Sequence, residues 1–278
     1  MATVDLTTKF LAKVDEQFST ESKRALVTNQ DFSWDGANTV RVYMVNTGTM
    51  NDYARDGDPA TGSRFGTIEQ LNATTYPLTL TKDRSFTFVI DKLDADETQQ
   101  QLSGATALAR QNREVVIPEV DAYTYGVMCQ NAGTKPAAVE LTAANIYDEI
   151  CKASVLMDEK LVPEDGRVLV VTPETYRLLK KSSEIVLDTA VGEDMRLKGV
   201  ISNLDGAAIQ KIPASRLPSK FGFMLCHPIA TVAPLKLEDY RIHADPPGIS
   251  GSLVEGRVAY DAFVLKNKAA AIYYQATV

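Results

Sequence analysis

The chain is poor in histidine, which limits the chemistry open to it. It has two histidines among 278 residues, His227 and His243. Histidine is the usual side-chain base and a common metal ligand, so triads and metal sites have few places to form. His227 follows Cys226 directly, and neighbouring residues on a strand point to opposite faces, which disfavours a nucleophile and base pair.

Carboxylates do not replace the missing imidazoles. The densest group, Asp91, Asp94, Asp96 and Glu97, could supply half of a divalent-metal site. Asp94 and Glu97 have the spacing of a capping box, however, so helix capping is the favoured interpretation. We expect no catalytic residue, no cofactor, no metal and no enzyme activity.

Cysteine and long apolar runs are also scarce. Cys129, Cys151 and Cys226 are odd in number and widely spaced in apolar or helical sequence, so we expect buried thiols and no disulfide framework. No apolar run reaches the roughly 18 residues of a transmembrane helix. Residues 1–20 are polar and charged, unlike a secretory signal. We therefore expect no membrane contact and a cytoplasm-like compartment.

Basic side chains are outnumbered, 29 against 36 acidic ones, which gives a net charge of −7 and a pI near 5.0. Binding to a nucleic-acid backbone depends on clustered lysine and arginine. The densest basic cluster, Arg177 with Lys180 and Lys181, fits the solvated side of a short helix. Tight nucleic-acid binding is therefore not expected.

The chain does have a polar, glycine-punctuated segment, Asn46–Asn72, between two strand-like arms. Alternating apolar residues mark the arms at Thr39–Val45 and Phe86–Ile90, and we expect these arms to pair. Structureless loops beyond roughly 12–15 residues are uncommon in compact domains. This loop is therefore either disordered or in contact with another molecule, and the second option indicates an assembling protein.

Charges of both signs lie along this loop. Solvation is their usual role, but arginine also binds carboxylates in a bidentate manner. We name as subunit-interface candidates the loop residues Arg55, Asp56, Asp58, Arg64 and Glu69.

Near the start of the chain, Phe10 and Phe18 belong to a helical apolar pattern with charged residues between. This amphipathic helix either packs on its own domain or docks on a neighbouring subunit. Phe10 and Phe18 are therefore interface candidates too.

A long helix is predicted from Asp94 to Gly133, interrupted at Pro118, where the missing N–H forces a kink or restart. If continuous, it would be roughly 50 Å long, the length of a spine in an elongated subunit.

A mixed α/β unit follows. Ile146, Ile150, Ala153 and Met157 lie on one side of a helix that Thr142 can cap. Val168–Val171 reads as a strand buried on both faces, and Thr172-Pro173 opens another helix. Short strands separated by turn signals continue from Gly199. The fold class is α+β.

Two segments, Val116–Tyr123 (VIPEVDAY) and Val162–Leu179, resemble the major capsid proteins of tailed bacteriophages, which have the Hong Kong 97-type fold. Gly199–Pro218 is similar to that family's axial-domain hairpin, and Arg257–Leu265 to its final strand. The family's order of parts also matches: an N-terminal arm, an extended β-hairpin loop, a long spine helix in a peripheral domain, and a mixed α/β axial domain.

The resemblance implies five parts: an arm (1–30), the extended loop with its flanking strands (31–93), a peripheral domain with the spine helix (94–164), an axial domain (165–255) and returning C-terminal strands (256–278). It implies a protein that assembles with itself into pentamers, hexamers and an icosahedral shell around double-stranded DNA, without tight DNA binding. Scaffold, portal and decoration proteins are possible partners. The location implied is the virion, after assembly in the bacterial host cytoplasm.

Two alternatives stay open. An encapsulin, a bacterial compartment with the same fold, would have an inner groove for a cargo tail, and no segment here identifies one. A soluble α+β enzyme is the other, and the scarcity of histidine disfavours it.

Overall fold

The structure, a computed structural model, describes residues 22–29, 31, 39–45, 47, 49–57, 63–66, 70, 73–97, 103–182 and 203–278. The chain divides into two compact units, a smaller one, Trp34–Leu80, and a larger one made of Met1–Ser33 and Thr81–Val278. The predicted N-terminal helix with Phe10 and Phe18 lies outside the described residues. Within them, no helix combines the length and apolarity that crossing a membrane requires.

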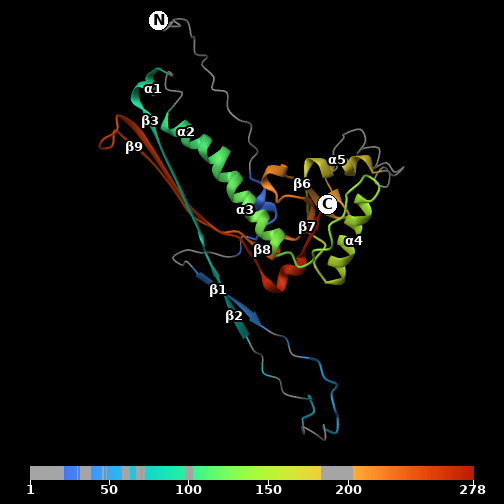
Figure 1. Cartoon of the computed structure of the whole chain (residues 1–278). Coiled ribbons are helices and arrows are strands. Elements are labelled where there is room, and N and C mark those ends of the chain that lie inside the picture. The colour runs from blue at the N-terminus through green and yellow to red at the C-terminus, as the bar shows by residue number, and fades with distance from the viewer. Residues whose placement is uncertain are drawn as a thin grey trace. The chain divides into compact units, whose positions relative to one another are not determined.

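The smaller unit is built on a two-stranded antiparallel ladder (Figure 1). β1 (Thr39–Val45) pairs with β2 (Ala73–Thr79) along its full length. The predicted pairing of the first arm with Phe86–Ile90 is therefore wrong. β2 consists mainly of threonine and alanine with one proline, so it lacks the apolar alternation that marks a strand in a sequence, although β-branched threonine suits an exposed ladder.

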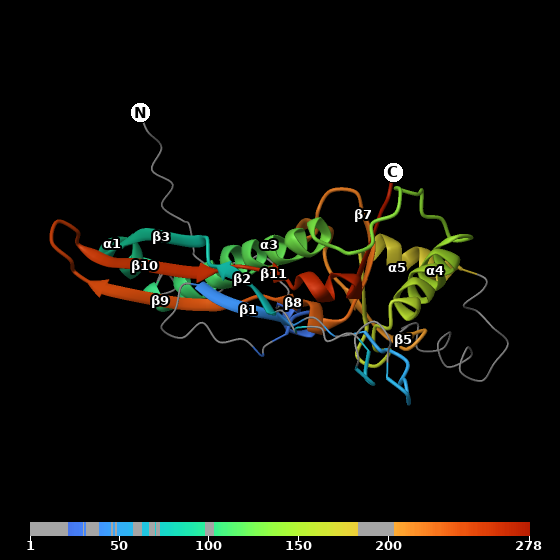
Figure 2. The same ribbon diagram turned by 90° about the horizontal axis from the view of Figure 1, so that it is seen from below.

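The larger unit contains a three-stranded antiparallel sheet (Figure 2). Its strand order is β3 (Lys82–Asp91), β10 (Gly251–Tyr260) and β9 (Leu235–Ala244). The second predicted arm is part of β3 and pairs with β10. Val258 and Tyr260 pack with Val120 on one face of this sheet. Gly256 lies against the ring of Phe86, and a Cβ there would come within 2.3 Å of that ring.

The predicted spine is helical but does not begin at Asp94. α1 (Lys92–Glu97) starts earlier, and Asp91 Oδ1 accepts a hydrogen bond from Leu93 N at 2.8 Å. A separate start follows at α2 (Gly104–Gln111), where the Ser103 side chain accepts from Thr106 N. The capping assignment of Asp94 is therefore wrong, because an aspartate three residues earlier satisfies the first turn.

From α2 the helix continues through η2 (Asn112–Val116) into α3 (Ile117–Gln130), a stretch of roughly 40 Å (Figure 1). η2 is a π-helical turn that ends two residues before Pro118. The wider turn accommodates a residue that cannot donate to the preceding carbonyl, so the predicted interruption occurs without breaking the helix.

A five-stranded sheet forms the main core. Its order is β12 (Ile272–Ala276), β7 (Phe221–Cys226), β4 (Val168–Val171), β6 (Ala207–Lys211) and β5 (Asn203–Leu204), with β4 and β6 parallel and the other pairs antiparallel. All four residues of β4 are buried, which confirms the prediction for this strand. β5 and β6 form the predicted hairpin about Asp205-Gly206.

Two helices pack on this sheet. α4 (Ile146–Glu159) buries Ile146, Ile150, Ala153 and Met157, as predicted. It begins later than expected, because Asn145 Oδ1 accepts from Thr142 N and the helix follows that turn. α5 (Pro173–Lys181) is capped by Thr172, as predicted.

Short elements complete the larger unit: β8 (Thr231–Val232) paired with β11 (Phe263–Val264), and the one- or two-turn helices η1 (Arg24–Leu26), η3 (Ala214–Arg216), η4 (Pro228–Ala230) and η5 (Lys266–Ala271). The predicted domain boundaries stay a prediction. The three-stranded sheet joins strands from the ranges 31–93, 165–255 and 256–278.

The three cysteines are free thiols. Burial raises the pKa of both Cys129 and Cys226 to about 12, which makes these thiols unreactive at neutral pH. Cys151 is only partly buried, so its predicted burial is too strong. His227 Nε2 hydrogen bonds with Asp165 O and the Cys226 thiol with Val168 O, so the two side chains have separate partners.

Candidate assembly surfaces

The described part of the loop between β1 and β2 has structure of its own. Ala54 N donates to Arg64 O at 3.0 Å, which joins the two branches of the loop, and Gly57 N donates to Ala54 O at 3.1 Å. The rings of Tyr53 and Phe65 meet edge to face, with centroids 5.2 Å apart. This geometry is favourable for aromatic pairs. The loop therefore presents a defined aromatic cluster.

That cluster is exposed within its unit. Met50 is 99% exposed, Phe65 79% and Tyr53 54%. Arg55, Asp56 and Arg64 are exposed beside it, while Asp58 and Glu69 lie outside the described residues. Exposed aromatic residues with arginines at the rim are the usual composition of a binding hot spot. The prediction named the charged residues and missed the aromatic ones, although an aromatic pair in so polar a segment was a visible signal.

A buried carboxylate fixes the chain where the larger unit resumes after Leu80. Asp261 is 2% exposed. Its Oδ2 accepts from Thr81 N at 2.8 Å and Thr81 Oγ1 at 2.9 Å, and its Oδ1 accepts from Tyr123 OH and Ala262 N at 2.8 Å each. Burial, followed by the Asp261 hydrogen bond, raises the pKa of Tyr123 to about 12. Asp261 thus ties the start of β3 to α3.

Sequence reasoning missed Asp261. The residue lies in the apolar run Arg257–Leu265, where a lone acidic residue was the only available signal. Its partners are 138 and 180 residues away in the chain, and local patterns do not reveal such contacts.

A second buried carboxylate holds residues 22–29. Asp121 Oδ1 accepts from Ser22 Oγ at 2.6 Å, and its Oδ2 pairs with Arg216 Nη1 at 2.9 Å. Gln210 Nε2 donates to Lys23 O at 2.8 Å, and the side chain of Val27 is fully buried. The segment that leads in from the N-terminal residues is therefore attached to α3 and β6, and Asp121 also joins α3 to η3.

The outer face of the three-stranded sheet carries paired charges of both signs. Arg257 pairs with Asp83, and Arg241 Nη2 lies 2.9 Å from Asp239 Oδ2. These side chains are about half exposed, and such pairs contribute little to stability. The face is therefore polar and carries charges of both signs.

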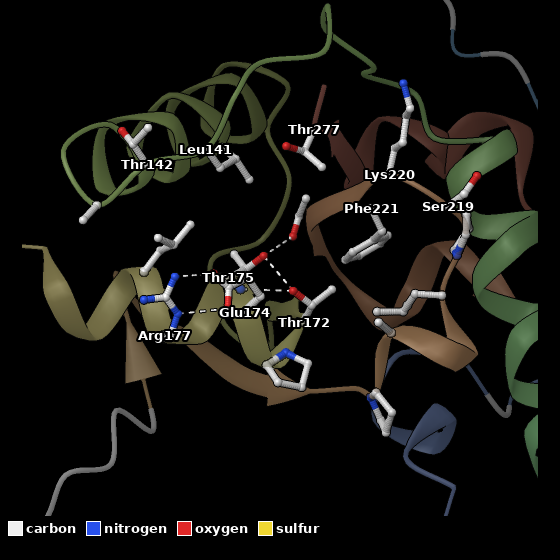
Figure 3. Close-up of a pocket in the computed structure, with 18 residues that line it drawn as sticks. Leu141, Thr142, Thr172, Glu174, Thr175, Arg177, Ser219, Lys220, Phe221 and Thr277 are labelled. Atoms are coloured by element: carbon white, nitrogen blue, oxygen red, sulfur yellow. Dashed lines mark hydrogen bonds and ion pairs between the residues drawn. The ribbon is translucent and has the colours of Figure 1, made fainter.

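A cleft of about 970 Å³ opens at the N-terminal end of α5 (Figure 3). Thr172 Oγ1 accepts from Thr175 N at 3.0 Å, and Thr175 Oγ1 donates to Gly222 O at 2.8 Å, which fixes the cleft floor. Its charged lining residues are Glu174, Arg177 and Lys220, and Arg177 forks onto Glu174. The rest of the lining is apolar or hydroxylic and includes neither histidine nor cysteine. The cleft therefore has the composition of a binding recess.

No protein-family model and no curated protein sequence matches the chain. Solved structures do. A chain from Mycobacterium phage Che8 aligns with a TM-score of 0.82 and 20% identity, covering 99% of this chain and 98% of that one. The capsid of the Cyanophage P-SCSP1u gives 0.79 and 12% (98% and 93% covered), and the bacteriophage PhiM1 mature capsid 0.77 and 14% (98% and 92%).

The chain has the phage capsid fold. The predicted α+β fold of Hong Kong 97 type is confirmed. Because coverage is nearly complete in both directions, the capsid fold accounts for both the hairpin unit and the larger unit. The aromatic loop cluster, the Asp261 anchor and the Asp121 anchor are features of this chain within that capsid fold.

Proposed function

We propose that this chain is the major capsid protein of a tailed phage, which assembles with itself into pentamers and hexamers and then into an icosahedral shell around double-stranded DNA. The observation that carries this proposal is the alignment with capsid structures over at least 98% of the chain. A GTA particle capsid also aligns, with a TM-score of 0.65. These similarities favour a shell subunit over the soluble enzyme.

The loop between β1 and β2 supports the same function. The exposed Tyr53 and Phe65 pair, with the exposed Met50 of the same loop, is costly in a free monomer, because exposed apolar surface favours association. We assign this cluster to a contact with a second copy. Its rim includes the candidates Arg55, Asp56 and Arg64, and the remaining candidates are Phe10, Phe18, Asp58 and Glu69.

The proposal also covers location and partners. The protein is a virion component, assembled in the host cytoplasm, with scaffold, portal and decoration proteins as its possible partners. With a net charge of −7, its shell wall encloses DNA without binding it tightly. Retention of DNA on purified subunits should therefore be negligible at physiological salt.

Electron microscopy and light scattering of the purified protein test this function. We expect capsomer rings or closed shells, with masses that are large multiples of the 30.4 kDa chain. A monomer that persists at all protein and salt concentrations would refute the proposal. Particles from a producing host separate the phage capsid from a compartment shell, because the capsid should protect DNA from nuclease and the compartment should enclose protein cargo.

A further inference from the structure

Leu161 has an unfavourable backbone conformation. It follows the C-terminal end of α4, with φ of 58°. This left-handed region suits glycine, the usual residue just beyond a helix, because a Cβ there meets the backbone. A leucine at this position costs stability relative to glycine. Strained residues of this kind gather at functional sites, so the position warrants an explanation.

The Leu161 side chain gains nothing within the subunit to offset that cost. It is 90% exposed, whereas the next residue, Val162, is 9% exposed and packs in the core. A single exposed leucine is ordinary on a protein surface. An exposed leucine that also strains its backbone is not, because glycine or asparagine would serve the isolated subunit better.

Buried contacts hold the Leu161 turn in place. Leu161 N donates to Asp158 O at 2.9 Å, and Val162 N donates to Met157 O at 3.1 Å. The Arg167 side chain is 2% exposed, and it donates to Pro163 O at 2.9 Å and Val162 O at 2.6 Å while pairing with Asp158 at 2.6 Å. The leucine is therefore presented on a rigid turn, which lowers the entropy cost of inserting it into a partner.

The surface around Leu161 is acidic. Glu159, Glu164 and Asp165 are all exposed. Arg167 is buried and paired with Asp158, so Lys160, which donates to Thr134 Oγ1, is the one exposed cation within residues 158–165. We call residues 158–165 the acidic knob. It combines one protruding apolar side chain with a surplus of negative charge.

The cleft described above has the complementary character. Its walls include Leu141, Leu178, Pro213, Leu217 and Phe221, and Lys220 stands exposed at its edge. In Figure 3, Lys220 lies across the cleft from the Arg177 and Glu174 pair, which neutralises itself. The cleft is therefore lined by apolar and hydroxylic side chains, with one positive charge in excess.

The knob and the cleft are at opposite ends of α4. Leu141–Ala143, just before α4, line the cleft, and the knob begins as α4 ends. At 1.5 Å per residue the helix separates them by about 21 Å, so a copy cannot fill its own cleft. A knob on one copy and a cleft on the next give a head-to-tail contact, and such contacts generate rings when the rotation closes.

We propose that Leu161 of one copy inserts into the cleft of the next copy, with Glu164 and Asp165 facing Lys220, and that this contact closes the capsomer ring. The proposal rests on the shell function proposed above and names the surfaces that would carry it. The occupant of the cleft is a second copy of this chain.

Leu161→Gly is the first test, with Leu161→Met as the matched control. Glycine accepts φ of 58°, so the thermal midpoint of the Leu161→Gly monomer should equal or exceed that of the wild type. Its critical concentration for assembly should rise about tenfold or more, because a buried leucine side chain is lost from the contact. Leu161→Met should assemble like the wild type. Wild-type assembly by Leu161→Gly would overturn the proposal.

Charge reversal is the second test. Glu164→Lys with Asp165→Lys, and separately Lys220→Glu, should each impair ring formation, and combining all three in one chain should restore it. A combined variant no better than either parent would overturn the head-to-tail contact while leaving the shell function standing. A wild-type protein that forms neither rings nor shells would instead refute the shell function, and this contact with it.

Discussion

Replacing Asp261 with alanine should destabilise the larger unit by about 3–5 kcal/mol. The substitution removes the acceptor of four hydrogen bonds. The Ala262 amide is buried and would be left unsatisfied, at a cost of about 1–3 kcal/mol. Thr81 is exposed and Tyr123 is partly buried, so water replaces their lost bonds in part, and each contributes about 1 kcal/mol.

Asp261→Asn separates hydrogen bonding from packing. An asparagine has one acceptor oxygen where the aspartate has two, so its amide group must face either Thr81 N or Ala262 N. Each of these is a donor, and two donors cannot bond. We expect a loss of about 2–3 kcal/mol, between those of the wild type and the alanine variant.

Urea unfolding followed by circular dichroism measures both variants. Asp83→Asn is the matched control, because Asp83 belongs to an exposed ion pair and its loss should leave the unfolding curve close to that of the wild type. Amide hydrogen exchange should accelerate at both Thr81 and Ala262 in the alanine variant, and at one of the two in the asparagine variant. The anchoring role of Asp261 would be refuted if the alanine variant had a free energy of unfolding within about 1 kcal/mol of the wild-type value. It would also be refuted if the asparagine variant were as stable as the wild type.

Three further predictions follow from the structure. Gly256→Ala should cost about 1–3 kcal/mol, because its Cβ would meet the Phe86 ring. Gly126→Ala should be neutral or stabilising, because a Cβ at that position in α3 meets open space. Thermal unfolding of the two variants checks this, and equal effects would contradict the packing. Because the pKa of Tyr123 is raised to about 12 from an ordinary 10, its contribution to stability is complete below pH 10 and is lost as the pH rises to 12. The free energy of unfolding of Tyr123→Phe should therefore fall less steeply between pH 10 and 12 than that of the wild type. Parallel curves of unfolding free energy against pH would contradict this. Phe65→Ala should leave the circular dichroism spectrum unchanged but reduce shell yield severalfold in light scattering, and wild-type yield would remove the loop cluster from the assembly contact.

The sequence revealed those elements whose pattern is local. Val168–Val171 is apolar throughout, and the Thr172-Pro173 start of α5 is a strong capping signal, so both predictions are confirmed. Strand pairing was not predictable in the same way. Two segments downstream could pair with Thr39–Val45, namely Ala73–Thr79 and Phe86–Ile90. The true partner is Ala73–Thr79 (β2), which is too polar to be recognised as a strand.

The assembly surfaces were only partly predictable. The length of the Asn46–Asn72 segment indicated a contact, but which residues face outward depends on the turn at Ala54 and on the Tyr53 ring contact. The strain at Leu161 is invisible in a sequence, because leucine normally signals core. It becomes informative only when φ and exposure are known together.

The pairing of strands that are far apart in sequence, in the two larger sheets, sets when a newly made chain can fold. β3 pairs with β10, so Lys82 has no partner until Tyr260 has been synthesised. β12 likewise pairs with β7 only after Ile272 has been synthesised opposite Cys226. Contacts this far apart in sequence form slowly and only after both partners have left the ribosome. A chain stopped before residue 272 lacks a strand of its central sheet. Translation itself thus delays the completion of the larger unit, and an unfinished chain lacks the full cleft, whose lining includes Thr277.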